Sequence, residues 1–189
     1  MMPARHRSHL AVIALLACCG STTPAGAEEA PDRNGRTLLP RPERTPGAAL
    51  PGCTVADLNR RGYSASVRPV PGFTRRLKRE QLQSGYQGRS LRFTCVEEDH
   101  LIPIGWCGNP QSEQNLWPQL RESCGAPRDQ SAEAKDVCEY QGFELIRRGH
   151  LDLGQAQSGV AHDWIQYCQK VVAPLAERFH VGAPRGRSE

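Results

Sequence analysis

The spacing of the cysteines restricts this chain more than any other feature of its sequence. Six of its eight cysteines are spread between positions 53 and 168, and no Cys-x-x-Cys pair occurs. Structural zinc sites usually take their ligands from such close pairs, so the spacing argues against zinc and favours disulfides. The sequence leaves the pairing open. The six residues are Cys53, Cys95, Cys107, Cys124, Cys138 and Cys168.

The amino-terminal segment predicts export, which would bring these cysteines into an oxidising compartment. Arg5 and Arg7 precede an apolar run over residues 10–17. That run is much shorter than the ~20 residues that span a bilayer, so it is typical of a signal peptide and not of an anchor. We therefore expect a periplasmic or secreted protein.

Two cleavage sites fit this signal. A small-residue site after Ala27 predicts a signal peptide over residues 1–27 and a disordered leader over residues 28–46. The alternative is a lipoprotein signal over residues 1–17, with a lipid anchor on Cys18. Cleavage after Ala27 is favoured because it leaves an even number of cysteines, whereas lipidation of Cys18 would leave Cys19 unpaired.

Charge and length limit the class of protein further. Removing Arg5 and Arg7 lowers the 24 Lys and Arg to 22, against 20 acidic residues, so the net charge falls to +2. Such a balance creates no overall field that attracts nucleic acid. The length suits one domain, which we place at residues 47–175, followed by a disordered tail over residues 176–189.

Patterns along the domain predict an α+β fold. Ser131 and Asp152 are good N-caps, which predict a helix over about 132–148 and a last helix after Asp152. Thr74 is the expected N-cap of an earlier helix. The expected elements are a strand over 63–68, a helix over 74–84, strands near 94–104 and 114–118, and the two later helices.

The pair Asp99-His100 carries the sharpest chemical signal. It ends an apolar strand, a loop with two glycines follows, and Asn115 opens a second apolar run. Adjacent residues point to opposite faces of a strand, so a bend at its end can aim one side chain at a metal and the other at water. Hydrolysis of a phosphodiester needs both, a hard cation with oxygen ligands and a base.

These residues resemble a known family. The stretches 97–103 (EEDHLIP), 115–118 (NLWP) and Lys135-Asp136 resemble the HNH (His-Me finger) nucleases, and more closely a group of small exported bacterial HNH-like proteins. The similarity covers residues 45–171. It implies a disulfide-stapled ββα-metal hairpin-helix core with flanking helices. It also implies an exported metal-dependent endonuclease that hydrolyses phosphodiesters of nucleic acid.

The resemblance also implies roles for single residues. His100 matches the general base, Asp99 the metal ligand beside it, and Asn115 the residue that holds the loop together. The family's third ligand, a His or Asn on the next helix, is absent here; Asp136 or Glu133 would take its place. One divalent ion is implied, Mg²⁺ first, with Mn²⁺ or Zn²⁺ as alternatives.

Other charged residues admit two interpretations. Lys135 would stabilise the scissile phosphate or pair with Glu139 one turn further on. The basic side chains of residues 75–79 would contact phosphate or remain solvated, and Glu97 and Glu98 are expected at a solvated strand edge. The competing functional hypothesis is a non-catalytic secreted or envelope binding protein that keeps the hairpin as a scaffold.

The sequence also predicts where the three tryptophans lie. Trp117 and Trp164 are expected in the core, because both lie in apolar periodic segments. Trp106 lies in the loop near the candidate site and is considered for base stacking.

Overall fold

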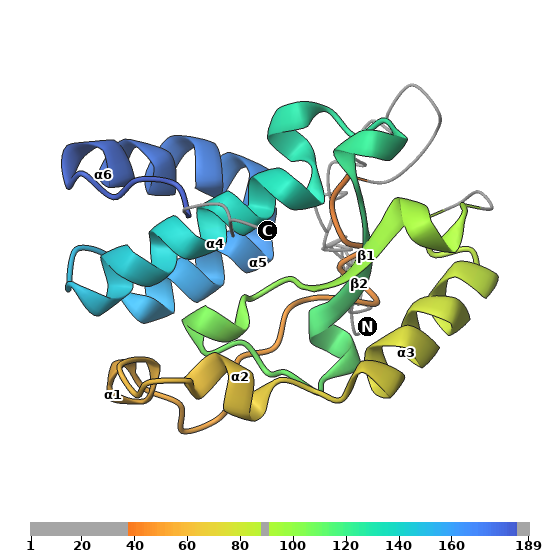
Figure 1. Cartoon of the computed structure of the whole chain (residues 1–189), viewed down its shortest axis with the longest axis horizontal. Coiled ribbons are helices and arrows are strands. Elements are labelled where there is room, and N and C mark those ends of the chain that lie inside the picture. Colours follow the sequence, from red (N-terminus) through yellow and green to blue (C-terminus); the bar gives the residue numbers. More distant parts are fainter. Residues whose placement is uncertain (1–37, 88–90, 185–189) are drawn as a thin grey trace, which may run out of the picture.

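The computed structural model describes residues 38–87 and 91–184; the predicted signal over residues 1–27, with Cys18, lies outside them. Within the described part, helices surround one two-stranded antiparallel sheet (Figure 1). Figure 1 shows α4, α5 and α6 together on one side of this hairpin and α3 on the other. The predicted α+β class is confirmed. No helix of residues 38–87 or 91–184 is long and apolar enough to cross a membrane.

The elements follow in a simple order along the chain. The α-helices are α1 (Val55–Leu58), α2 (Tyr63–Val67), α3 (Pro71–Gln83), α4 (Ala132–Arg147), α5 (Leu153–Tyr167) and α6 (Ala173–Arg178). The strands are β1 (Val96–His100) and β2 (Leu116–Leu120), and a π-helical turn, Cys168–Val172, joins α5 to α6. Short 3₁₀ turns lie at Phe93–Cys95, Ile104–Trp106, Glu113–Asn115, Glu122–Cys124 and Arg128–Gln130.

The register of the hairpin explains why the sheet tolerates a proline. Leu101 N donates to Asn115 O at 2.8 Å. In an antiparallel pair, residues alternate between pointing their backbone N–H and C=O groups toward the partner strand and away from it, so this bond shows which residues do which. Pro118 lies opposite Glu98. Both residues turn their backbone groups away from the partner strand, so the missing N–H of the proline removes no hydrogen bond of the ladder.

Side chains cover both outer edges of this small sheet. On β1, Lys78 Nζ donates to Val96 O at 3.0 Å and Lys135 Nζ donates to His100 O at 2.8 Å. These contacts protect an edge that would otherwise offer free backbone groups to another chain. On β2, the outward carbonyls accept hydrogen bonds from Thr45, Gln81 and Gln87.

The two long helices begin where their N-cap residues predict. Ser131 Oγ accepts a hydrogen bond from Ala134 N at 3.2 Å, and Asp152 Oδ1 accepts one from Gln155 N at 2.8 Å. Each cap satisfies an N–H that the first turn of a helix leaves without a partner. The predictions at Ser131 and Asp152 are confirmed.

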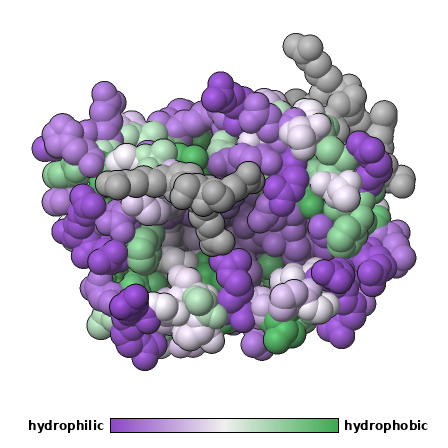
Figure 2. Space-filling model, in the orientation of Figure 1, coloured by the Kyte–Doolittle hydropathy of each residue, from purple (hydrophilic) through white to green (hydrophobic). Residues whose placement is uncertain are grey.

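All three tryptophans lie in the core. Trp117 and Trp164 are buried as predicted. Trp106 is fully buried as well, and its Nε1 donates to Glu139 O at 2.9 Å. The prediction that Trp106 stacks on a base is therefore wrong, because the loop folds its indole inward against α4. The face shown in Figure 2 is mostly hydrophilic, with small separate groups of apolar residues.

Three disulfides select one pairing from those that the sequence left open. Cys53–Cys107 ties the segment before α1 to the hairpin loop, and Cys138–Cys168 joins α4 to the end of α5. Cys95–Cys124 closes the base of the hairpin. Such a set of disulfides is typical of a chain that folds in an oxidising compartment.

Residues 63–67 form helix α2 where a strand was expected. The alternation of Tyr63, Ala65 and Val67 suggests a strand, but Tyr63 and Val67 are also one helical turn apart. The structure uses the helical spacing: both side chains pack against the main core, and Gly62 adopts a left-handed φ of 79° where the helix begins. Six residues are too few for the pattern to distinguish the two periods.

The packed region is longer than the predicted 47–175. Leu38 is buried and its carbonyl accepts a hydrogen bond from Trp164 Nε1, so part of the expected leader packs on the domain. At the other end, α6 and the buried Val181 continue the packing into the expected tail.

Candidate functional site

A cavity of about 630 Å³ runs along the outer edge of β1. Four consecutive β1 residues, 97–100, line it, so it reaches both faces of the strand. The segment from α2 to α3 forms one wall, including Arg68, and α4 forms the other, including Asp136 and Glu139. The structure thus brings the predicted residues Asp99, His100 and Asp136 together in one cavity.

His100 is held in one orientation at the end of β1. Its Nε2 lies 3.0 Å from Pro110 O, and only 8% of the residue is exposed. A carbonyl oxygen only accepts, so Nε2 carries the proton and Nδ1 keeps its lone pair. Burial lowers the pKa of His100 and outweighs the neighbouring Asp99. The ring is therefore neutral at neutral pH, the form that a base requires.

Asn115 fastens the loop that holds His100. Its Oδ1 accepts from Ile102 N at 2.9 Å and from Ala48 N at 3.3 Å, while its Nδ2 donates to Ile102 O at 2.9 Å and to Asn109 O at 3.2 Å. The side chain is fully buried and lies outside the cavity lining. These four bonds hold the loop at Ile102 and at Asn109. Asn109 precedes Pro110, whose carbonyl orients His100.

Lys135 lies behind the cavity wall and is 1% exposed. Its Nζ lies 2.7 Å from Asp99 Oδ2, donates to His100 O at 2.8 Å and donates to Glu139 Oε1. Burial lowers the pKa of Lys135, but Asp99 and Glu139 outweigh this effect and raise it. The ammonium is charged, buried and in contact with Asp99, Glu139 and His100 O, so of the two interpretations the structure shows the pairing with Glu139.

The remaining carboxyl groups of the cavity are partly buried, which changes their pKa values. Neither oxygen of Glu98 has a hydrogen-bond partner among residues 38–87 and 91–184, and burial raises the pKa of this carboxyl to about 9. Burial also raises the pKa of Asp136 and of Glu97, which pairs with Arg121. The expectation of a solvated edge is wrong for Glu98, whose carboxylate oxygens are buried, and holds in part for Glu97, whose side chain is 34% exposed.

The basic side chains of α3 divide into two groups. Lys78 turns inward, and its Nζ donates to the carbonyls of Val96 and Phe93. Arg75, Arg76 and Arg79 are exposed. Of the basic residues of α3, these three are open to solvent, and Arg76 also pairs with Glu80, with 3.7 Å between Nε and Oε1.

The predicted metal ligands are not arranged as a ready site. Oδ2 of Asp99 is taken by Lys135, and Glu133 Oε2 accepts from Glu122 N at 3.0 Å. Within residues 38–87 and 91–184, no group of three His, Cys, Asp or Glu side chains is placed to hold a metal ion.

Sequence reasoning missed Glu98 and Pro110 as parts of this site. It named Glu139 only as one of two possible partners of Lys135, from their four-residue spacing. Nothing in the sequence signals the carbonyl of Pro110, because its contact with His100 depends on the path of the loop.

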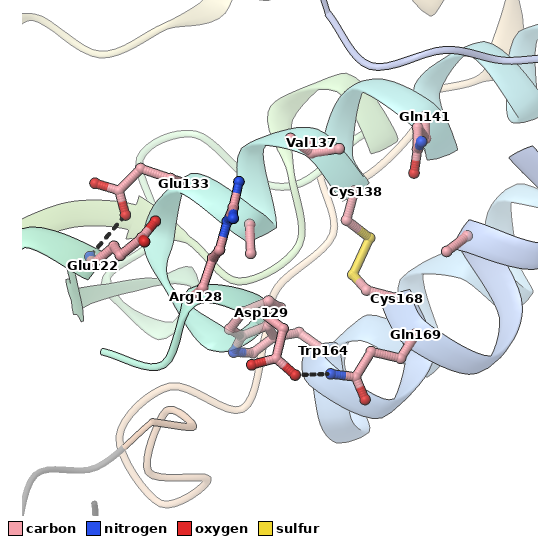
Figure 3. Close-up of a pocket in the computed structure, with 12 residues that line it drawn as sticks. Glu122, Arg128, Asp129, Glu133, Val137, Cys138, Gln141, Trp164, Cys168 and Gln169 are labelled. Atoms are coloured by element: carbon pink, nitrogen blue, oxygen red, sulfur yellow. Dashed lines mark hydrogen bonds between the residues drawn. A yellow bond between two sulfur atoms is a disulfide. The ribbon is translucent and has the colours of Figure 1, made fainter. Parts of the chain in front are cut away.

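A second cavity, of about 660 Å³, lies beside the Cys138–Cys168 disulfide. Figure 3 shows that Asp129 meets Gln169, and Glu133 meets the backbone of Glu122, at its margin. It contains none of the five residues predicted to form the site, so the cavity along β1 is the candidate.

Comparison of the chain with family models, with curated proteins and with solved structures gives no match. The assignment of a function therefore depends on the residues of the cavity.

Proposed function

We propose that this protein hydrolyses phosphodiesters of nucleic acid in the cavity along β1, and that β1, β2 and α4 form a hairpin-helix unit of the HNH-like ββα kind. The observation that supports this most is the state of His100. The ring is neutral and its Nε2 proton is held by Pro110 O; within residues 38–87 and 91–184 its Nδ1 makes no hydrogen bond, and the side chain lines the cavity. A base with these properties accepts a proton from water at neutral pH.

The chemistry follows from this arrangement. Nδ1 of His100 takes a proton from water as the water oxygen bonds to phosphorus. The bond from phosphorus to the leaving oxygen breaks and its electron pair stays on that oxygen, which then takes up a proton. Glu98 is placed to supply it, because alternate residues of a strand share a face and its buried carboxyl is protonated below pH of about 9.

The divalent ion stays a prediction from the sequence. Such an ion would add positive charge next to the phosphate. Asp136 is exposed in the cavity and available, but Asp99 shares its Oδ2 with Lys135. The residues as arranged do not fit the expected ligand pair, so no step is assigned to an ion here.

The competing function is a non-catalytic binding protein. The specific observation in its favour is the charge of the cavity: besides the protonated Glu98, four carboxyl groups line the wall, and Lys135 pairs with two of them. A surface of this kind favours a cationic ligand over a polyanion.

The two functions are separated by one cleavage experiment. The purified protein, with its disulfides formed, is incubated with supercoiled plasmid and with single-stranded RNA, in Mg²⁺, Mn²⁺, Zn²⁺ or EDTA. His100→Ala should lower cleavage by about 10²–10⁴-fold, the usual contribution of a general base. His162→Ala is the matched control, because His162 is exposed on α5, away from the cavity. A folded protein that cleaves neither substrate under any condition would support the binding function.

A further inference from the structure

Lys135 has the surroundings of a bound cation. Three oxygens from two elements meet its Nζ: Asp99 Oδ2 at 2.7 Å, His100 O at 2.8 Å, and Glu139 Oε1. Two of these are carboxylate oxygens and one is a backbone carbonyl, the donor types that hard cations take in proteins. An ammonium has three N–H groups; two of its contacts are hydrogen bonds, to His100 O and Glu139 Oε1, and the third is the ion pair with Asp99 Oδ2, which lacks hydrogen-bond geometry.

We infer that Lys135 is the resident cation of this site, and that its ammonium takes the place at Asp99 where the sequence predicted a divalent ion. The site then works with a single positive charge that is part of the chain and needs no divalent ion at Asp99. The inference rests on the proposed function for its chemical meaning, but its test measures ion binding and unfolding, not cleavage.

Burial separates this arrangement from an ordinary surface ion pair. Lys135 is 1% exposed, while the side chains of Asp99 and Glu139 are 14% and 26% exposed. A buried charge is stable only when it is paired and hydrogen-bonded, so the ammonium cannot swing away to admit another cation. Its position is also fixed from both sides, by α4 through the backbone and by β1 through His100 O.

An ammonium and a divalent ion exclude one another here. A divalent ion on Asp99 would sit about 2.0–2.6 Å from the carboxylate. The Oδ2 atom already has Nζ at 2.7 Å, so the two cations would be near neighbours in a buried place and would repel each other. Removal of the ammonium should reverse this, because it leaves two carboxylates and a carbonyl without a counter-charge.

The test compares wild type with Lys135→Met. Mn²⁺ binding is measured by electron paramagnetic resonance, and the unfolding temperature is measured in EDTA, Ca²⁺ and Mn²⁺. We expect wild type to show no change in unfolding temperature with either ion. Lys135→Met should unfold at lower temperature in EDTA, recover with Ca²⁺ or Mn²⁺, and bind Mn²⁺ at least tenfold more tightly than wild type.

Two controls keep the result clear. Lys170→Met removes an exposed lysine that bonds only to Gln166 in the described structure, and it should behave as wild type. The triple variant Asp99→Asn, Lys135→Met, Glu139→Gln removes the charges together; it should fold without ions and bind none.

Three outcomes would overturn the inference. The first is stoichiometric binding of Mn²⁺ by wild type that Asp99→Asn abolishes. The second is a folded Lys135→Met that binds Mn²⁺ no better than wild type. The third is a Lys135→Met that stays unfolded with every ion while the triple variant folds. Each would be clear whether or not the protein cleaves phosphodiesters, so failure of the inference and failure of the proposed function are distinguishable.

Discussion

Replacing Asn115 with alanine tests how the loop at the end of β1 is held. The substitution leaves four backbone groups without their partner: Ile102 N and O, Ala48 N and Asn109 O. All lie around a side chain that is 0% exposed. Water has little access to Ile102 N and O, whose bonds are buried, and more access to Ala48 N and Asn109 O, whose bonds are part-buried.

The size of the effect follows from these bonds. A buried partner left unpaired costs about 1–3 kcal/mol. The two bonds to Ile102, both at 2.9 Å, alone give about 2–6 kcal/mol. A water molecule admitted into the space left by the amide offsets part of the total. We expect Asn115→Ala to lower the free energy of unfolding by about 3–5 kcal/mol.

Urea unfolding followed by tryptophan fluorescence, with the disulfides intact, measures this change by linear extrapolation. The matched control is Asn59→Ala. Asn59 is exposed and makes a 3.0 Å bond to Arg147, so its loss should change stability by about 0.5 kcal/mol or less. A loss below about 1 kcal/mol for Asn115→Ala, with the same dependence on urea, would refute the view that this amide holds the loop.

Two further predictions concern packing and pH. Alanine at Gly142 would place its Cβ 2.0 Å from Trp106 Cζ2, so Gly142→Ala should destabilise by about 1–3 kcal/mol. At Gly154 the nearest atom to an added Cβ is 3.4 Å away, so Gly154→Ala should instead stabilise α5 by about 0.5–1 kcal/mol. The urea midpoints of both variants measure these changes, and equal effects would contradict the packing argument. Burial raises the pKa of Glu98 from 4.5 to about 9, so between these values the folded protein holds a proton that the unfolded chain has lost. The free energy of unfolding therefore falls as pH rises across this window. Glu98→Gln should remove that part of the slope, so its stability relative to wild type should rise from about pH 5 to pH 9. Parallel curves of stability against pH for the two proteins would rule this out.

Local signals were right for two of the three predicted N-caps; the third, Thr74, is wrong, because α3 begins at Pro71 and the Thr74 hydroxyl donates back to Pro71 O. Ser131 and Asp152 cap α4 and α5 as predicted, because capping involves only residues three apart in the chain. The hairpin was predicted from two apolar runs separated by a loop; β1 lies within the first predicted strand, whereas β2 overlaps the second and continues to Leu120. The helix α2 was missed because a six-residue pattern satisfies both periods, and contacts of Tyr63 and Val67 with the distant core decide between them.

The sequence predicted which residues form the site, but not their protonation or their hydrogen-bond and ion-pair partners. The sequence named Asp99, His100, Asn115, Lys135 and Asp136, and three of them line one cavity while two lie behind it. It left the use of Lys135 open between a phosphate and Glu139. That choice depends on burial, because a lysine enclosed by two carboxylates and a carbonyl stays charged and is shielded from a ligand.

By itself, the sequence determined the class of fold, the disulfide chemistry and the two helix caps, since each depends on residue type or on short spacing. Only the tertiary structure decided the cysteine pairing, the protonated nitrogen of His100, the partners of Lys135 and the burial of Glu98. These depend on groups far apart in the chain, such as Lys135 Nζ and His100 O, 35 residues apart, which meet once α4 packs against β1. Chain proximity sets local geometry, whereas desolvation and charge pairing are properties of the packed whole.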